Sequence, residues 1–444
     1  MNKYLFIPLA IVLVAALIFG GCKPSEETPT EILIGESTSL TGMYAGFATG
    51  GTFGIQAGFD DINKQGGIYI EEYGEKLPIR LIIVDNESNE LKAGSLAEDL
   101  LVRDNVHALI VAGAPQAVMT PVSTIADRYK IPYVGTGGLK EQFFALRETA
   151  SPPWEYTWNA SFALVVPYPP GSFWDKPGYT MADTMMAWLL SIVDQTNGKA
   201  ALFATDDIDG RAAYGLFPMV LGEAGFSTCG LEEELGIFPM GTTDFTSIIQ
   251  EWIDCDCDIL LGVAPAPDFG TLLRQCHTMG FKPKSIFAPK AAMFYTDVSS
   301  WGGDLPLGIL VDMLWTPSYD PEMCPGIGDT TSVSLYERWH EETGETLNTA
   351  LGVGYCAAQI MGDAIERAGS LDPDTLNEAI GDTHLDTIWG PIVFDKETHY
   401  AGSAISFGQW RKTDEPWVWE LQPVFALQEY MGETAEFVFP IPYD

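Results

Sequence analysis

Residues Glu31–Gly67, EILIGESTSLTGMYAGFATGGTFGIQAGFDDINKQGG, decide the fold class of this chain. The stretch opens with the apolar run Ile32–Ile34, which is bounded by a glycine and is typical of a buried parallel strand. A loop rich in Ser, Thr and Gly is expected to follow, from Glu36 to about Gly51. In open α/β sheets, small molecules bind at the carboxyl ends of the strands, so this loop is a candidate ligand site. An ordinary βα unit with a long loop is the alternative, and the stretch alone does not separate the two.

A helix is predicted after this loop. Ile55, Phe59 and Ile62 recur at spacings of four and three, which is the pattern of one buried helix face. Gly66 and Gly67 are expected to end the helix, because glycine readily adopts the left-handed conformation of a helix C-terminus.

Three further strand–loop–helix units follow within about a hundred residues, with strands expected at 79–84, 108–111 and 133–134. A polar or glycine-rich loop follows each strand. Repeated βα units of this kind predict a parallel, doubly wound sheet.

A second alternating series predicts a second lobe. Strands are expected at 199–205, 259–263, 285–288 and 308–314, and helices at 211–224, 245–252, 269–280, 332–343, 348–369 and 374–381, before a β-rich tail from Trp389. The stretch Ser151–Gly178, with six prolines, is either a surface excursion or a contribution to the cleft. Two α/β lobes predict a ligand cleft between their loop ends.

The composition excludes several classes of protein. The hydrophobic fraction of 46% is ample for packed cores, and 444 residues suit two or three domains. There are 61 acidic and 23 basic residues, a formal net charge of −38, which repels phosphate backbones. Nucleic acid is therefore not an expected partner.

The first 22 residues have the form of a secretory signal. Lys3 supplies a positive charge, residues 5–19 are apolar and uncharged, and Gly20 and Gly21 precede Cys22. This ending resembles a lipobox, which implies that Cys22 is lipidated and anchors the chain to a membrane. An uncleaved membrane helix is the alternative. Residues 23–30 are polar and suit a flexible tether, so the rest of the chain is expected outside the cytoplasm.

Motifs for catalysis are not found. The sequence contains no HExxH, GxSxG or GxxxxGK[ST] pattern, and the acidic cluster at 206–209 does not fit an EF-hand loop. Cys255 and Cys257 are spaced like a metal-binding pair, but the sequence shows no neighbouring CxxC or His to complete a set. The six cysteines after Cys22 permit disulfides. No catalytic residue, metal or cofactor is predicted.

The chain resembles the type I solute-binding proteins of the branched-chain amino acid (Leu/Ile/Val-binding) class, the substrate-binding lipoproteins of ABC transporters. The resemblance extends over nearly the whole chain after the signal segment. It is carried in order by Ile32-Leu33-Ile34-Gly35, Leu40-Thr41-Gly42, Asp61-Ile62-Asn63, Gly66-Gly67-Ile68, Val84-Asp85-Asn86, Val106-His107-Ala108, Ile131-Pro132-Tyr133-Val134, Thr243-Asp244-Phe245, Leu273-Arg274-Gln275 with Gly280, Trp389-Gly390-Pro391-Ile392 and Phe394-Asp395.

The resemblance implies an α/β fold of two doubly wound lobes, between which the chain crosses three times. The expected boundaries are 31–155 for the first part of lobe 1, 156–292 for the first part of lobe 2, 293–385 for the return to lobe 1, and 386–444 for the return to lobe 2. It also implies a monomeric, non-enzymatic receptor that captures an amino acid or related carboxylate by hinge closure and delivers it to an ABC permease. A sensor with a signalling partner is the main alternative, and a hydrolase is a lesser one.

The ligand contacts that the resemblance implies fall in the loops after the strands. They are Phe47, Pro115, Gln116, Thr136, Gly137, Gly138, Asp209, Ala264, Pro265 and Lys290. Two of them depart from the family pattern. Asp209 stands where relatives often have a tyrosine. Lys290 falls near the position at which amino-acid-binding relatives have an acidic residue that pairs with the ligand's α-ammonium. We therefore expect a carboxylate ligand without an obligatory α-amino group, or an ammonium bound by Asp209 instead. A solvated Lys290 outside the site is the alternative.

Overall fold

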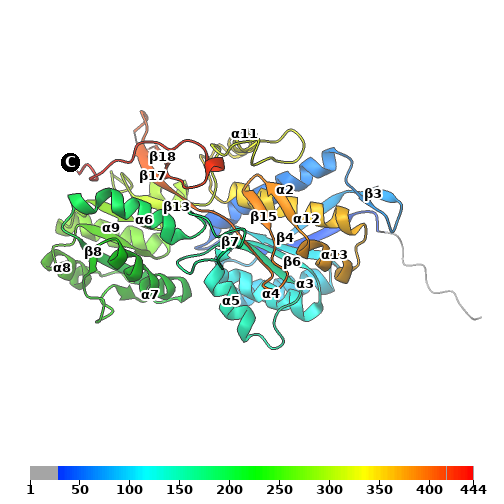
Figure 1. The fold of residues 1–444 in the computed structure, drawn as a ribbon, viewed down its shortest axis with the longest axis horizontal. Helices are drawn as coiled ribbons and strands as arrows, with labels where there is room; N and C mark the ends of the chain where they lie inside the picture. Colours follow the sequence, from blue (N-terminus) through cyan, green and yellow to red (C-terminus); the bar gives the residue numbers. More distant parts are fainter. Residues whose placement is uncertain (1–28, 417, 444) are drawn as a thin grey trace, which may run out of the picture.

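The computed structural model describes residues 29–416 and 418–443. Two β-sheets, each packed between helices, form two lobes that lie side by side along the long axis of the molecule (Figure 1). The predicted signal segment, Cys22 and the tether up to residue 28 lie outside the described residues. Within the described part, no helix is both long enough and apolar enough to cross a bilayer.

The first lobe contains a six-stranded sheet in which every neighbouring pair is parallel. Its strands, in spatial order, are β16 (Tyr400–Gly402), β7 (Thr157–Phe162), β6 (Tyr133–Leu139), β5 (Ala108–Ala112), β1 (Ile32–Thr38) and β4 (Ile79–Asp85). Its main helices are α2 (Ala45–Lys64), α3 (Glu90–Val102), α4 (Gln116–Tyr129), α5 (Lys140–Thr149), α11 (Ser332–Thr343), α12 (Leu351–Ala368) and α13 (Pro373–Gly381). The predicted parallel, doubly wound sheet is confirmed.

Alternate residues of β5 show how the two faces of this sheet are covered. Leu109 and Val111 pack in one cluster with residues of α3 and α4, while Ile110 packs in the larger core with residues of α2 and α12. β5 is therefore apolar on both faces, which explains its continuous hydrophobic run.

The second lobe is built on a larger, mixed sheet. In spatial order it contains β10 (Ile237–Phe238), β8 (Lys199–Thr205), β11 (Ile259–Val263), β12 (Ser285–Phe287), β13 (Leu310–Met313), β17 (Ser406–Lys412) and β18 (Trp419–Phe425), with β9 (Ser227–Thr228) also paired to β8. Its helices are α6 (Met181–Ile192), α7 (Ile208–Glu223), α8 (Thr246–Asp254), α9 (Ala266–Met279) and α10 (Tyr295–Ser300). The strands up to β13 are parallel, while β17 and β18 are antiparallel additions from the C-terminal region.

The remaining elements are short. They are the hairpins β2 (Ile68–Ile70) with β3 (Glu75–Leu77) and β14 (His384–Thr387) with β15 (Gly390–Val393), and the 3-10 turns η1 (Val193–Gln195) and η2 (Glu429–Met431).

The sequence-based lobe boundaries need correction. β7 adds to the first sheet by pairing with β6, so this lobe extends beyond residue 155, and β13 belongs to the second sheet, so that lobe extends beyond residue 292. β16 returns to the first sheet, beyond residue 385. The expected boundaries came from the family resemblance, whereas the sheet to which a strand belongs is set by its pairing with strands far away in the sequence.

The start of α2 is also different from the prediction. The loop after β1 is short, and α2 begins at Ala45, although a loop was expected to about Gly51. Five glycines in α2 allow this helix to approach its neighbours closely. A Cβ atom on Gly51 would lie 2.5 Å from the carbonyl oxygen of Ala112, and one on Gly54 would lie 2.1 Å from that of Leu351 in α12. Tertiary packing therefore outweighs the low helix propensity of glycine here.

The proline-rich stretch 151–178 is not a simple surface excursion. It contains β7, and its tryptophans Trp154, Trp158 and Trp174 are buried. Lys140 of α5 donates to the carbonyl oxygens of Val166 and Pro167. The stretch is therefore part of the core of the first lobe.

Candidate functional site

A cavity with about 630 Å³ of empty space, including its mouth, lies between the two lobes. It is lined mainly by apolar side chains and glycines, namely Phe47, Gly113, Ala114, Pro115, Gln116, Gly137, Gly138, Leu139, Phe162, Leu164, Met181, Asp209, Ala213, Val263, Pro289, Lys290, Met293, Asp312 and Leu314. Its residues come from both sheets, and many of them follow the carboxyl ends of parallel strands, as the topology requires.

Seven of the ten predicted contacts line this cavity: Phe47, Pro115, Gln116, Gly137, Gly138, Asp209 and Lys290. The other three lie beside it. The Thr136 side chain is fully buried, and its hydroxyl donates to the carbonyl oxygen of Val353 at 3.1 Å. Ala264 follows the lining residue Val263, and Pro265 is the N-cap of α9. The structure thus brings most of the predicted residues together, while their role in binding stays a prediction.

The first lobe contributes the start of α4 to the cavity wall. Gln116 is the first residue of this helix, although it was expected in the preceding loop. Its side chain is buried, and its amide nitrogen donates to Thr120 at 3.2 Å, while Oε1 has no partner among the described residues. Backbone N–H groups in the first turn of a helix carry partial positive charge and have no partner within the helix. This end of the cavity therefore suits an anion.

Gly137 and Gly138 shape the same wall from β6. Their φ angles are 98° and 72°, in the left-handed region that favours glycine. A Cβ atom on Gly138 would lie 2.6 Å from Oε1 of Gln116. The two glycines therefore bring backbone close to the unpartnered end of the Gln116 amide.

The second lobe contributes an ion pair to the opposite wall. Lys290 Nζ lies 2.5 Å from Oδ2 of Asp209 and 3.6 Å from Oδ2 of Asp207. Burial lowers the pKa of Lys290, but the two carboxylates outweigh this effect and hold the pKa above its usual range. Asp207 also caps α7 by accepting from the Gly210 N–H at 2.7 Å. Lys290 is therefore neither a solvated loop residue nor an unpaired cation, and Asp209 is not an unpaired acid.

Three contacts connect the lobes across the cleft. The Gln142 amide of α5 donates to Oδ1 of Asp209 at 2.7 Å. The rings of Phe47 and Phe294 meet edge to face at 4.7 Å between centroids, and Lys290 Nζ lies 5.5 Å from the centre of the Tyr44 ring. These contacts hold the two walls of the cavity against one another.

Sequence reasoning did not identify Asp312 or the apolar residues around it. Asp312 and Leu314 lie at the end of β13, and Phe162 and Leu164 lie at and after the end of β7, so the rule on strand carboxyl ends could have found them. Burial raises the pKa of Asp312 to about 7, against the effect of the hydrogen bond that its side chain accepts from the Lys290 backbone N–H.

Few polar side chains line the cavity. Among the described residues that line it, none is Ser, Thr, Cys, His or Tyr. The polar groups present are one amide, two carboxylates and one ammonium. Such a set can orient a solute, but it offers no hydroxyl, thiol or imidazole as a nucleophile.

Comparison with known proteins agrees with this architecture. The profile of a family described as periplasmic binding protein matches residues 31–415. Similar solved structures include the leucine-binding protein LivK from Thermotoga maritima, at 18% identity and a TM-score of 0.66 over 88% of this chain and 97% of that one.

Two further solved structures were obtained with small molecules. The branched-chain amino acid transporter substrate-binding protein LivJ from Streptococcus pneumoniae, in complex with isoleucine, has 16% identity and a TM-score of 0.66 over 88% of this chain and 99% of that one. A solute-binding protein of an ABC transporter from Rhodopseudomonas palustris BisB5, in complex with 3,4-dihydroxybenzoic acid, has 18% identity and a TM-score of 0.67 over 91% and 99%. These likenesses show the fold. Because the family profile covers most of the sequence, the chain belongs to the periplasmic binding protein family, and it has the type I fold of that family.

Proposed function

We propose that this protein captures a small organic carboxylate with an apolar body outside the cytoplasm, by closing its two lobes, and delivers it to an ABC permease. The observation that carries the proposal is an apolar cavity between the lobes. One wall contains the N-terminus of helix α4, and the other contains the Lys290 ammonium, which is already paired with Asp209. The backbone N–H groups at the start of α4, with the Gln116 amide, are the expected partners of the carboxylate.

The Lys290–Asp209 pair argues against an obligatory α-ammonium on the ligand. The ammonium group of Lys290 already occupies the carboxylate of Asp209, so a second ammonium would meet a positive charge at short range. Asp312 is the one other lining acid, and burial favours its neutral form. Keto and aromatic acids therefore suit the site better than the corresponding amino acids. The complexes of the structural neighbours with isoleucine and with 3,4-dihydroxybenzoic acid contain ligands of both kinds.

Calorimetric titration with matched ligands tests the proposal. Leucine, its 2-keto analogue and 3,4-dihydroxybenzoate share a carboxylate and differ in the ammonium group and the apolar body. We expect at least one of the two acids without an ammonium to bind roughly tenfold or more tightly than leucine, which corresponds to about 1.4 kcal/mol. Tighter binding of leucine, undiminished in Lys290→Glu, would contradict the assignment of the ligand class.

The proposed membrane anchor depends on Cys22, which lies outside the described residues. If this cysteine is lipidated, the wild-type protein partitions into the membrane fraction and its N-terminal peptide carries acyl chains in mass spectrometry. Cys22→Ala is expected to release the protein while leaving ligand affinity unchanged, because the first residue that lines the cavity is Phe47. Equal membrane partitioning of the variant would contradict lipidation at this position.

A further inference from the structure

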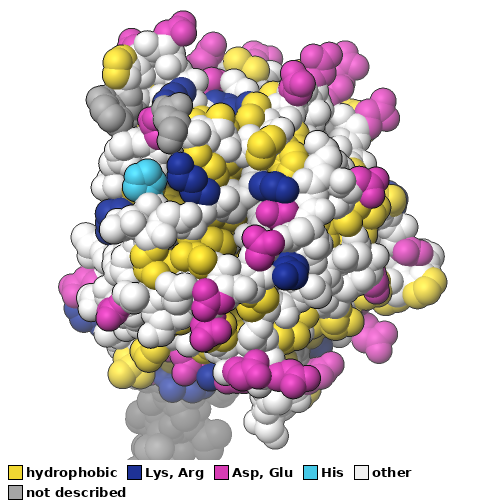
Figure 2. Space-filling view, turned by 90° about the vertical axis from the view of Figure 1, so that its left-hand side faces the viewer, with side chains coloured by type: hydrophobic (Ala, Val, Ile, Leu, Met, Phe, Trp, Pro, Cys, Tyr) yellow, Lys and Arg dark blue, Asp and Glu magenta, His cyan; other side chains and the backbone are white. Residues whose placement is uncertain are grey.

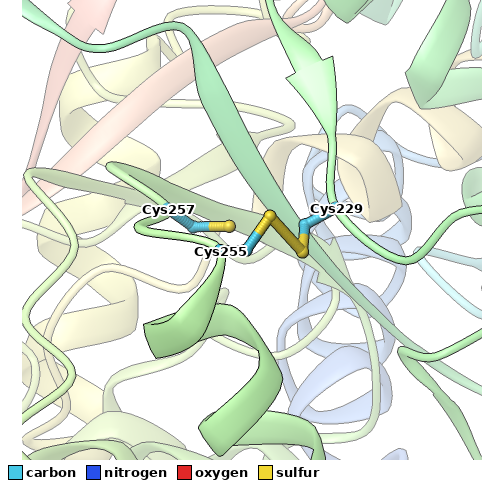
Figure 3. Close-up of side chains that lie close together, drawn as sticks. All are labelled: Cys229, Cys255 and Cys257. Atoms are coloured by element: carbon cyan, nitrogen blue, oxygen red, sulfur yellow. A yellow bond between two sulfur atoms is a disulfide. The ribbon is translucent and has the colours of Figure 1, made fainter.

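Three cysteine side chains lie together in the second lobe, away from the ligand cavity. Cys229 and Cys255 form a disulfide, and the buried thiol of Cys257 lies next to it (Figure 3). All three sulfur atoms lie within 4.8 Å of one another. The sequence suggested Cys255 and Cys257 only as an incomplete pair, and the fold supplies Cys229 as a third member.

Three separate elements hold this cluster in place. Cys229 follows β9, Cys255 is the C-cap of α8, and Cys257 lies just before β11. Lys199 at the start of β8 also donates to the carbonyl oxygen of Cys255 at 2.8 Å, which connects the cluster to the sheet. The positions of the sulfur atoms are therefore fixed by the sheet and by α8, so reduction of the disulfide would leave them close together.

The cluster lies at the opposite end of the sheet from the ligand cavity. β11 runs from the side of Cys257 to Val263, which lines the cavity, and a strand of five residues spans roughly 16 Å. Cys229 and Cys255 are half-buried, so solvent can reach the cluster. It is thus a separate feature with its own access.

The spacing fits three thiolates around one metal ion. With a metal–sulfur bond of about 2.3 Å, three sulfurs in a trigonal arrangement lie roughly 4 Å apart, which these side chains reach by small rotations. Thiolate ligands select soft ions such as Cu⁺, and also Zn²⁺. Asp256 precedes Cys257, and its negative charge favours the approach of a cation, while Asp258 on the other side is paired with Lys284 at 2.9 Å.

We propose that Cys229, Cys255 and Cys257 form a redox-gated site for one soft metal ion. In the oxidised protein, the disulfide removes two of the three ligands. Two thiol groups of an external reductant open the site: they transfer two electrons and two protons to the disulfide and leave as a disulfide of their own. The ion then forms three metal–sulfur bonds, and the three thiol protons are released to solvent.

Cadmium binding tests this proposal, because the thiolate-to-cadmium charge-transfer band reports sulfur ligation directly. The full chain is titrated with Cd²⁺ under nitrogen in its oxidised form and after reduction and removal of the reductant. We expect one Cd²⁺ per reduced chain and no band in the oxidised chain. Competition with a chelator then gives the affinity, and repeating the competition with Cu⁺ tests the preference for a soft monovalent ion.

Two variants make the result specific. Cys257→Ala keeps the Cys229–Cys255 disulfide, so the folding of this variant can be checked in the oxidised state. After reduction, its affinity for Cd²⁺ is expected to fall by at least about tenfold, because loss of a group that only supports a metal ligand already has an effect of this size. Cys276→Ala removes a buried thiol of the same lobe outside the cluster and is expected to bind like wild type. Unchanged affinity in Cys257→Ala, or no charge-transfer band in reduced, folded wild type, would overturn the proposal.

Discussion

At the scale of single residues, the Lys290–Asp209 pair gives the first prediction. The two side chains are only 10% and 12% exposed, so Lys290→Met leaves a buried carboxylate without its cation. Removing one member of a buried pair costs about 3–5 kcal/mol, because the remaining charge has lost both water and its partner. We expect a loss of this size in the free energy of unfolding, measured by urea denaturation without ligand.

The control is an exposed ion pair with a similar distance between its nitrogen and oxygen atoms. Lys412 lies 2.7 Å from Asp304, and these side chains are 47% and 44% exposed, so Lys412→Met is expected to cost less than about 1 kcal/mol. The double variant Lys290→Met/Asp209→Leu is expected to recover most of the stability, since neither charge remains. Equal losses for the two lysine variants would show that burial does not govern the pair.

Asp312 gives a second prediction, on pH. Its pKa is raised to about 7, so the folded protein keeps this proton while the unfolded chain releases it near the ordinary value of about 4. The stability that this proton gives is present in full below about pH 4 and is lost as the pH rises to about 7. Compared with Asp312→Asn, wild type should therefore lose up to about 1.4 kcal/mol per pH unit in this window. Urea unfolding of both proteins across it measures the difference, and parallel curves would contradict the raised pKa.

Single residues also show where sequence reasoning stops. The position of Lys290 at the end of a strand was sufficient to place it near the cavity. Its partner Asp209 is 81 residues away, so a local pattern could not show that each charge neutralises the other. The same holds for Cys229, which reaches Cys255 only through the fold.

At the scale of elements, the packing of α2 on α12 gives a third prediction (Figure 1). Helix propensity alone would make Gly54→Ala stabilising by roughly 0.5–1 kcal/mol. The new Cβ atom, however, would lie 2.1 Å from the Leu351 carbonyl oxygen, and such overpacking typically costs about 1–3 kcal/mol. We expect net destabilisation in chemical denaturation.

A glycine in an open part of another helix is the matched control. A Cβ atom on Gly215 of α7 would meet no atom within 4 Å, so Gly215→Ala is expected to stabilise the protein slightly. If Gly54→Ala were stabilising as well, the close approach of the two helices would be wrong.

The bounds of some helices and strands could be predicted from the sequence, and those of others could not. β8, β11 and α11 begin and end where their apolar patterns predict, because those patterns reflect burial along the element itself. The start of α2 was missed because its glycines are explained by neighbours far away in the sequence, such as Ala112 of β5 and Leu351 of α12, which a local pattern does not contain.

At the scale of the whole molecule, the features to consider are the charge of the surface and the boundaries of the lobes. On the face in Figure 2, at the outer end of the second lobe, acidic side chains are widely scattered and Lys and Arg occur only in small groups. This distribution agrees with the net charge of −38. The lobe boundaries were mispredicted because a crossover is a property of sheet pairing, which is set by strands far apart in the chain.

The last prediction concerns closure of the two lobes. Gln142 belongs to the first lobe and Asp209 to the second, so their 2.7 Å hydrogen bond forms only when the lobes are together. A hydrogen bond to a charged group contributes about 1.5–3 kcal/mol.

Because ligand affinity depends on the population of the closed arrangement, Gln142→Ala should weaken binding roughly 10- to 100-fold in calorimetry. Gln250→Ala, which removes an exposed amide that donates to Asp254 within α8 of the second lobe, should bind like wild type. Small-angle scattering with saturating ligand should then give the same compact radius for both variants, since ligand supplies the closing free energy that Gln142 no longer contributes. An unchanged affinity in Gln142→Ala would mean that this contact does not take part in closure.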